Sequence, residues 1–145
     1  MRGATSREDR APDIYIAAAA LMRPDGATLL VRKRGSTIFM QPGGKIEPGE
    51  APLVALFREL GEELGLSPTD DGAVYLGRFD APAALEDGNR VIAELYRVET
   101  ADDLAAHAEI EEIRWLMPPE RGSLELAPLT RDIVLPAIWN MARAV

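Results

Sequence analysis

The chain of 145 residues has no cysteine, a single histidine and no long apolar run. Without cysteine it cannot form disulfides, thiolate zinc sites, iron–sulfur clusters or cysteine nucleophiles, which fits a reducing compartment. The longest apolar run, Ile14 to Met22, is too short to cross a bilayer. A formal net charge of −8 shows that the chain also lacks the basic excess with which proteins bind nucleic-acid phosphates. We therefore predict a cytoplasmic protein that binds neither a membrane nor nucleic acid.

The remaining composition is that of one folded domain. Hydrophobic residues make up 47% of the chain, and its 145 residues are enough to bury a core without disulfides or structural zinc. The polar segment 1–10 has no apolar core of a signal peptide, so we expect a flexible N-terminal tail. Residues 11–145 are then expected to form a single domain.

Apolar runs separated by turn residues predict a sheet. The predicted strands are 14–22, 27–33, 38–41, 75–79, 91–98 and 113–117. The first two are expected to form a hairpin across the turn 23–26, whereas Pro42-Gly43-Gly44 is expected to open a loop. Residues 51–64 and 130–144 have helical spacing, and Pro136 is expected to kink the second helix or delay its start. Strands mixed with two helices predict an α/β layered domain.

Three carboxylates are crowded on the first predicted helix. At about 100° per residue, Glu63 lies ~40° from Glu59 and Glu62 ~60° to the other side, so all three share one face. Like charges at this spacing destabilise a helix by roughly 0.2–0.5 kcal/mol per pair. A divalent cation would turn that cost into a binding site, and carboxylate oxygens suit Mg²⁺ or Mn²⁺. Taken alone, such a cluster is more often the solvated face of an amphipathic helix, whose apolar stripe here is Leu53, Leu56, Phe57, Leu60 and Leu64.

The residues around these carboxylates follow a longer pattern. Gly44 is followed after five residues by Glu50, and after seven more by Arg58-Glu59-Leu60-x-Glu62-Glu63-x-Gly65-Leu66. At every specified position this resembles the Nudix box, Gly-x5-Glu-x7-Arg-Glu-U-x-Glu-Glu-x-Gly-U, with U a bulky aliphatic residue. The strand order and chain length are also similar to those of the family's α/β/α sandwich, in which a mixed sheet lies between helices.

The resemblance implies metal-dependent hydrolysis of a nucleoside diphosphate linked to another group X. By position, the carboxylates of Glu59, Glu62 and Glu63 and the carbonyl of Gly43 would hold Mg²⁺, with Mn²⁺ as an alternative. Glu59 and Glu63 would be catalytic. Glu59 would be primarily a ligand, and whether it or a carboxylate outside the box is the general base is left open.

Further residues would complete the site implied by the resemblance. Arg58 and Glu50 would support the geometry of the box. Ahead of the strand at 113–117, Glu109 would be the acidic residue that the family supplies outside the box, with Glu111 as the second choice. The lone His107 is an alternative base, although a surface histidine is the more common reading.

Three residues near the box are expected to contact the substrate. Arg32 ends the second strand, where the family commonly places a phosphate-binding cation, and strand alternation puts Lys33 on the opposite face. Gly44 lets the backbone approach a phosphate closely, and Lys45 adds a cation beside it.

We expect a pyrophosphohydrolase that acts on a nucleoside triphosphate or modified dNTP, because the segment 41–50 resembles that subfamily. Residues 127–132 contain no counterpart of the asparagine that reads an oxidised purine there. An ADP-ribose or dinucleotide pyrophosphatase, suggested by Pro82, and a non-catalytic nucleotide sensor are alternatives. The retained box carboxylates favour the enzyme. The expected partner is a small nucleotide, and homodimer formation is left open.

Overall fold

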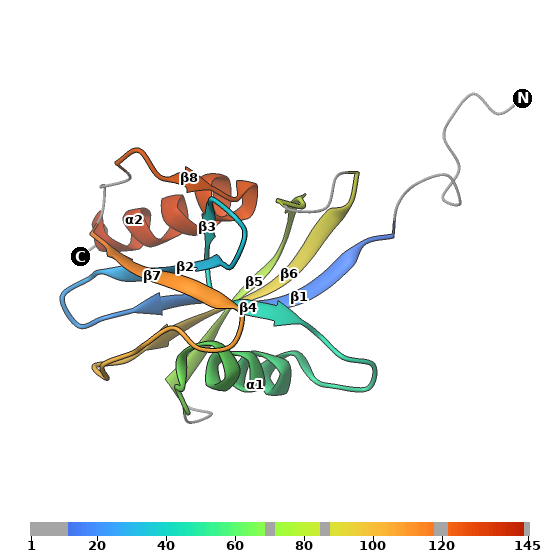
Figure 1. Cartoon of the computed structure of the whole chain (residues 1–145), viewed down its shortest axis with the longest axis horizontal. Helices are drawn as coiled ribbons and strands as arrows, with labels where there is room; N and C mark the ends of the chain where they lie inside the picture. The colour runs from blue at the N-terminus through green and yellow to red at the C-terminus, as the bar shows by residue number, and fades with distance from the viewer. Residues whose placement is uncertain (1–11, 69–71, 85–87, 118–121, 144–145) are drawn as a thin grey trace, which may run out of the picture.

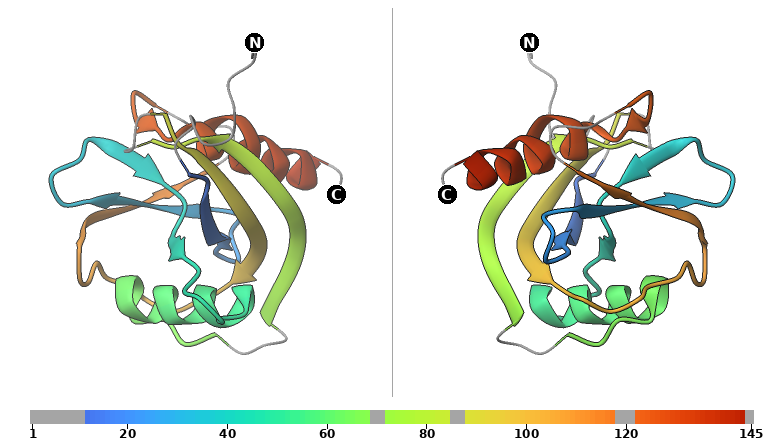
Figure 2. Two further views of the ribbon diagram at one scale, coloured as in Figure 1. Left: turned by 90° about the vertical axis from the view of Figure 1, so that its right-hand side faces the viewer. Right: turned by 90° about the vertical axis from the view of Figure 1, so that its left-hand side faces the viewer.

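The structure is a computed structural model that describes residues 12–68, 72–84, 88–117 and 122–143 (Figure 1). The tail predicted at 1–10 lies outside the described residues. Those that are described form a curled sheet with a helix against each face (Figure 2). This is the α/β fold class expected from the sequence, with a mixed sheet between helices.

One sheet gathers all eight strands of the described residues. They are β1 (Ile14–Met22), β2 (Thr28–Lys33), β3 (Ile38–Met40), β4 (Gly43–Lys45), β5 (Ala73–Pro82), β6 (Arg90–Glu99), β7 (Ile110–Leu116) and β8 (Glu125–Leu126). Six follow the order β5-β6-β1-β2-β3-β8, while β4 pairs with β1 and β7 pairs with β2. The β1–β6 and β3–β8 pairs are parallel and the others antiparallel, which includes the predicted β1–β2 hairpin.

Strand β1 positions both helices because it is buried on both faces. The four alanines from Ala17 to Ala20 are at most 1% exposed. Successive side chains of a strand point to opposite faces. Ala17 and Ala19 therefore pack under helix α1 (Pro52–Leu64), while Ala18 and Ala20 pack with residues of helix α2 (Leu135–Arg143). Their small methyl groups let both helices lie close to the central strand.

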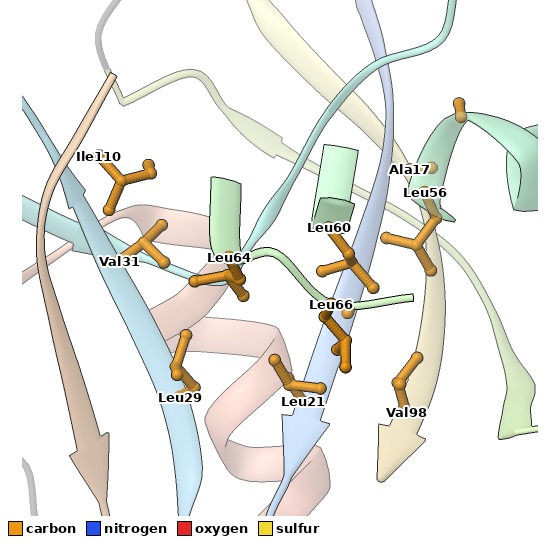
Figure 3. Close-up of a cluster of buried hydrophobic side chains, with 12 residues drawn as sticks. Ala17, Leu21, Leu29, Val31, Leu56, Leu60, Leu64, Leu66, Val98 and Ile110 are labelled. Carbon is orange, nitrogen blue, oxygen red and sulfur yellow. The ribbon is translucent and has the colours of Figure 1, made fainter. Parts of the chain in front are cut away.

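Helix α1 docks on the sheet through the predicted apolar stripe. Leu56, Leu60 and Leu64 pack against side chains of β1, β2 and β6 (Figure 3). Pro52 occupies the first turn, where its missing N–H removes no helical hydrogen bond. Gly65 ends the helix in the left-handed conformation with φ 70°, as predicted. The stripe fixes the rotation of α1 about its axis and so determines where its acidic residues point.

The structure contradicts the loop predicted at Pro42-Gly43-Gly44. Gly43–Lys45 forms β4, which pairs with β1 so that Gly43 lies opposite Ala18 and Gly44 opposite Ala17. At Gly43 φ is 142°, and a Cβ atom built there would lie 2.2 Å from the carbonyl oxygen of Ala17. Only glycine allows this approach of two backbones. Because glycine is depleted in strands generally, the sequence pattern favoured a loop.

The helical segment predicted from residue 130 begins there as a π-helical turn, and the α-helix itself begins at Leu135. A π-helical turn, η3 (Thr130–Val134), leads directly into α2, and the amide of Leu135 donates to the carbonyl of Thr130. Pro136 is the second residue of α2, so the α-helix starts late, with its proline in the first turn where it is tolerated. In the part of the chain that is described, no helix is long and apolar enough to cross a membrane.

Candidate active site

Two of the box carboxylates lie against the glycines of β4. The backbone N–H of Gly43 donates to Glu63 Oε1 over 3.2 Å. A Cβ atom built on Gly44 would lie 2.4 Å from Glu59 Cδ and 2.6 Å from each of its carboxylate oxygens. The absence of side chains on β4 therefore lets α1 bring Glu59 and Glu63 against the backbone of the sheet.

Both of these carboxylates are withdrawn from solvent. Glu63 is 2% exposed, and the side chain of Glu59 is 15% exposed. Burial raises the pKa of Glu63 to about 8, the charge of Glu59 adds to that increase, and the Gly43 N–H opposes it. Burial also raises the pKa of Glu59, although Arg58 counteracts part of the effect. The site therefore holds two acidic groups whose ionisation needs additional positive charge.

Arg58 holds the loop before α1 against the helix. Its guanidinium donates to both oxygens of Glu50 at 2.8 and 2.9 Å, to Glu59 at 2.9 Å and to the carbonyl of Lys45 at 3.1 Å. The two hydrogen bonds from Arg58 to Glu50, together with one from the Glu47 amide, lower the pKa of Glu50 to about 2. The Arg58–Glu50 pair thus links the start of the box to its helix.

Glu62 is more exposed than the other two carboxylates and contacts Arg58 from the solvent side. Its side chain is 55% exposed and lies 3.6 Å from Arg58. No group of three acidic, histidine or cysteine side chains among the described residues is arranged to hold a metal ion. Arg58 Nη1 nevertheless contacts both Glu59 and Glu62, so these two carboxylates lie on the same side of the helix as predicted. The helical offset of Glu62 carries it toward solvent, while Glu59 and Glu63 turn toward β4.

Lys33, rather than Arg32, reaches the carboxylates. The charge of Lys33 lowers the pKa of both Glu59 and Glu63, and its Nζ lies 3.6 Å from Glu109 Oε2. Arg32 instead donates to Glu112 at 3.1 Å and to the carbonyl of Ser36 at 2.9 Å. Sequence alternation separated Arg32 from Lys33 but did not indicate which face of β2 lies under α1. The packing of Leu29 and Val31 beneath α1 settles that question.

Glu109 lies where the resemblance suggested, directly before β7, and its charge contributes to the raised pKa of Glu63. Its neighbour Glu111 forms an exposed ion pair with Arg34 at 3.1 Å. His107 is exposed, and its ring borders Gly65 at the end of α1. The charge of Glu109 thus acts on Glu63, whereas His107 meets Glu63 through its backbone N–H, which donates to the Glu63 carbonyl over 2.8 Å.

An open cleft lies beside β4. Its described lining comes from β1, the end of β2, β3, β4, the turn end of the β5–β6 hairpin and the segment before η3, and includes Gly43, Gly44, Lys33, Lys45 and the buried Gln41. Much of the remaining lining is aliphatic. Strand β4 therefore separates an apolar cleft from two buried carboxylates, and Lys33 belongs to both regions.

Comparison with known proteins identifies the family. The sequence model of the NUDIX domain matches residues 13–136. The chain belongs to the Nudix hydrolase family. The CTP pyrophosphohydrolase of Escherichia coli (strain K12) is 33% identical over 133 residues, which cover 87% of this chain and 91% of that protein.

Two further proteins are similar to this Nudix hydrolase over a shorter stretch or at lower sequence identity. The RNA pyrophosphohydrolase of Halorhodospira halophila is 48% identical over 46 residues, which are 32% of this chain and only 25% of that protein. The crystal structure of a MutT NUDIX hydrolase from Burkholderia pseudomallei superposes with a TM-score of 0.72 at 22% identity, over 87% of this chain and 98% of that chain. This structural similarity shows that the two proteins share a fold.

Nudix hydrolases generally use a divalent metal ion, and the residues of this site fit one. The available donors are carboxylate and backbone oxygens, which hard cations prefer. Glu63 is buried, the charge of the partly buried Glu59 acts on it, and Arg58 is the cation that pairs directly with Glu59. A divalent ion would supply the missing positive charge and lower the cost of ionising Glu63.

Proposed function

We propose that this Nudix hydrolase is a pyrophosphohydrolase of a nucleoside triphosphate or modified dNTP, with Mg²⁺ or Mn²⁺ bound at the box carboxylates. The observation that favours this function is the position of β4, which lies between the apolar cleft and the carboxylates of Glu59 and Glu63. A nucleoside in the cleft would have its phosphates beside the metal site. The similarity to the E. coli CTP pyrophosphohydrolase along most of both chains supports the same substrate class.

We assign the metal to Glu59 and Glu63, with the carbonyl of Gly43 as a further ligand. Glu62 lies 3.6 Å from the same Arg58 nitrogen that donates to Glu59, and its exposed side chain can rotate to add a third carboxylate. When bound, the divalent ion neutralises charge on phosphate oxygens and lowers the pKa of a water molecule. The role of Arg58 is to keep Glu59 in position while Glu50 occupies the other side of the guanidinium.

The proton and the phosphates are assigned to residues around β4. We propose Glu109 as the general base, since its carboxylate lies near Glu63, and retain Glu59 as the alternative. Lys33 and Lys45 line the cleft and would neutralise the phosphate chain. In this proposal Lys33 replaces Arg32, because Arg32 is engaged on the other face of β2.

The decisive experiment is a substrate panel assayed for release of phosphate or pyrophosphate with Mg²⁺. The panel contains NTPs, dNTPs, oxidised dNTPs, ADP-ribose, dinucleoside polyphosphates and nucleotide sugars. We expect a nucleoside triphosphate to be turned over fastest. Faster turnover of ADP-ribose would favour the dinucleotide alternative, and tight nucleotide binding without any hydrolysis would favour the sensor.

Glu63→Gln tests the metal assignment. We expect it to lose at least about 100-fold in kcat/KM, because an amide cannot supply the negative charge that holds the cation. The fold should survive, since burial already favours the neutral form of this side chain, whose pKa is raised to about 8. Glu111→Gln is the matched control, because Glu111 lies in an exposed pair with Arg34. Undiminished turnover by Glu63→Gln would refute the assignment.

A further inference from the structure

Gln41 is a buried polar residue that the hydrolytic chemistry does not use. It follows β3, is 7% exposed and lines the cleft beside β4. Its backbone N–H donates to the hydroxyl of Thr130 over 3.2 Å. Thr130 is fully buried and is the first residue of the π-helical turn η3. The cleft wall therefore contains a fixed connection between the β3–β4 junction and the C-terminal helix.

This connection determines which way the Gln41 amide faces. The Thr130 hydroxyl already accepts the Gln41 N–H, and its own single hydrogen is donated to Gln41 Oε1. The amide oxygen is thus turned inward, and Nε2 is left without a hydrogen bond among the described residues. Every side-chain nitrogen or oxygen atom that is buried in this part of the chain has a partner. Nε2 is therefore accessible from the cleft that Gln41 lines.

The rest of the cleft makes this N–H₂ group distinctive. The described lining contains no Asp, Glu, Asn, Ser, Thr, Tyr or His, and its charged residues are Lys33 and Lys45. Around Gln41 the walls are aliphatic and include Ile16, Val91 and Leu129. A planar base can lie between such walls, and the cleft's side chains then offer it hydrogen-bond donors.

We infer that Gln41 is a specificity-determining residue that selects nucleotides whose base presents two adjacent acceptors. The two amide hydrogens of Nε2 match N3 and O2 of cytosine, or O6 and N7 of guanine. In uracil an N–H separates the two carbonyl groups, and in adenine an amino group lies beside each ring acceptor of the exposed edges. With uracil or adenine, one Nε2 hydrogen of Gln41 would therefore face an N–H group of the base. The inference rests on the proposed function, since it names the substrate class of the same site.

The expected discrimination follows from the hydrogen bonds at stake. A good bidentate contact to a base edge distinguishes it from the wrong base by roughly 10- to 100-fold. We therefore expect kcat/KM for CTP, GTP or both to exceed that for UTP and ATP by about this factor. The order of CTP and GTP identifies which of the two edges is read.

Two pairs of variants test the role of Gln41. Gln41→Leu removes the donors and keeps the size, so the ratio of kcat/KM between CTP or GTP and UTP should fall toward one. Gln41→Glu presents acceptors in place of donors and should lower that ratio further. Thr130→Val frees the amide to rotate and should weaken the discrimination, whereas Thr130→Ser keeps the hydroxyl and should restore it. Thermal unfolding of each variant confirms that the fold is retained.

Binding without metal separates this inference from the proposed function. The affinities of CMP, GMP, UMP and AMP are measured by NMR titration on the metal-free protein and on Gln41→Leu. The same base preference is expected, and it should be lost in the variant. Equal hydrolysis of all four triphosphates, or a preference unchanged in Gln41→Leu, would overturn the inference while leaving the proposed function intact. Base-selective binding without hydrolysis of any triphosphate would support the role of Gln41 and overturn the proposed function.

Discussion

Gly44→Ala should abolish most activity without unfolding the protein. The added Cβ would lie 2.4 Å from Glu59 Cδ, whereas an ordinary contact begins at 3.4 Å, so the carboxyl group must move by about 1 Å (3.4 − 2.4). The clash involves the end of a flexible side chain rather than backbone. Gly44 also has no positive φ, so alanine fits its backbone conformation.

The expected effect on activity is large because Glu59 is proposed to hold the metal. A displacement of about 1 Å at a reacting group can cost about 100-fold in rate. The free energy of unfolding should change by less than about 1 kcal/mol, since alanine also reduces the entropy of the unfolded chain. The measurements are kcat/KM over a series of Mg²⁺ concentrations and thermal unfolding without metal. The apparent Mg²⁺ affinity should fall together with kcat/KM.

Gly43→Ala is the matched comparison, because the same substitution one residue earlier meets backbone. Its Cβ would lie 2.2 Å from the Ala17 carbonyl oxygen, at a φ of 142°. Backbone strain and overpacking together should cost at least about 2 kcal/mol. The melting temperature should then fall by roughly 5 °C or more. If Gly44→Ala keeps activity within threefold of wild type, or destabilises as much as Gly43→Ala, the proposed geometry is refuted.

Two further predictions concern the cations of the site. Lys33→Ala should raise KM for the nucleotide roughly tenfold through loss of a charge-assisted contact. Arg32→Ala should leave KM within about twofold, because its contacts lie on the other face of β2. Equal changes of KM in steady-state kinetics of the two variants would contradict the assignment. Arg58 and the Glu47 N–H lower the pKa of Glu50 to about 2, below its ordinary 4.5. The stability that Glu50 adds is therefore present above pH 4.5 and is lost as the pH falls toward 2. Urea unfolding at pH 7 and 3 should show the gap between wild type and Glu50→Gln shrinking on acidification, and a constant gap would argue against this pair.

The sequence could predict the elements whose side chains decide their structure. The apolar run Ile14–Met22 became β1 with its predicted bounds, and the stripe of α1 packed on the sheet between Pro52 and the Gly65 cap. The spacing from Gly44 to Leu66 indicated the family, which the NUDIX match at residues 13–136 confirms. In each case the spacing of residue types along the chain is enough to predict the element, because the spacing acts through the local geometry of a strand or helix.

The parts that sequence reasoning missed depend on contacts between distant backbones. Strand β4 consists of two glycines and a lysine and owes its existence to pairing with β1. The choice between Arg32 and Lys33 required knowing which face of β2 is covered by α1. The connection between Gln41 and Thr130 joins residues 89 positions apart, and neither residue belongs to the box pattern from Gly44 to Leu66.

The two glycines of β4 also affect how substrate choice and chemistry depend on each other. A wall without side chains cannot transmit a change from one side to the other by altered rotamers. The distance between the cleft and the carboxylates is instead set by backbone pairing with β1, which belongs to the core. Replacements at the cleft's aliphatic walls or at Gln41 can therefore change which base is accepted while the hydrolytic apparatus keeps its geometry. Such separation allows one catalytic helix to serve many nucleotide specificities in the course of evolution.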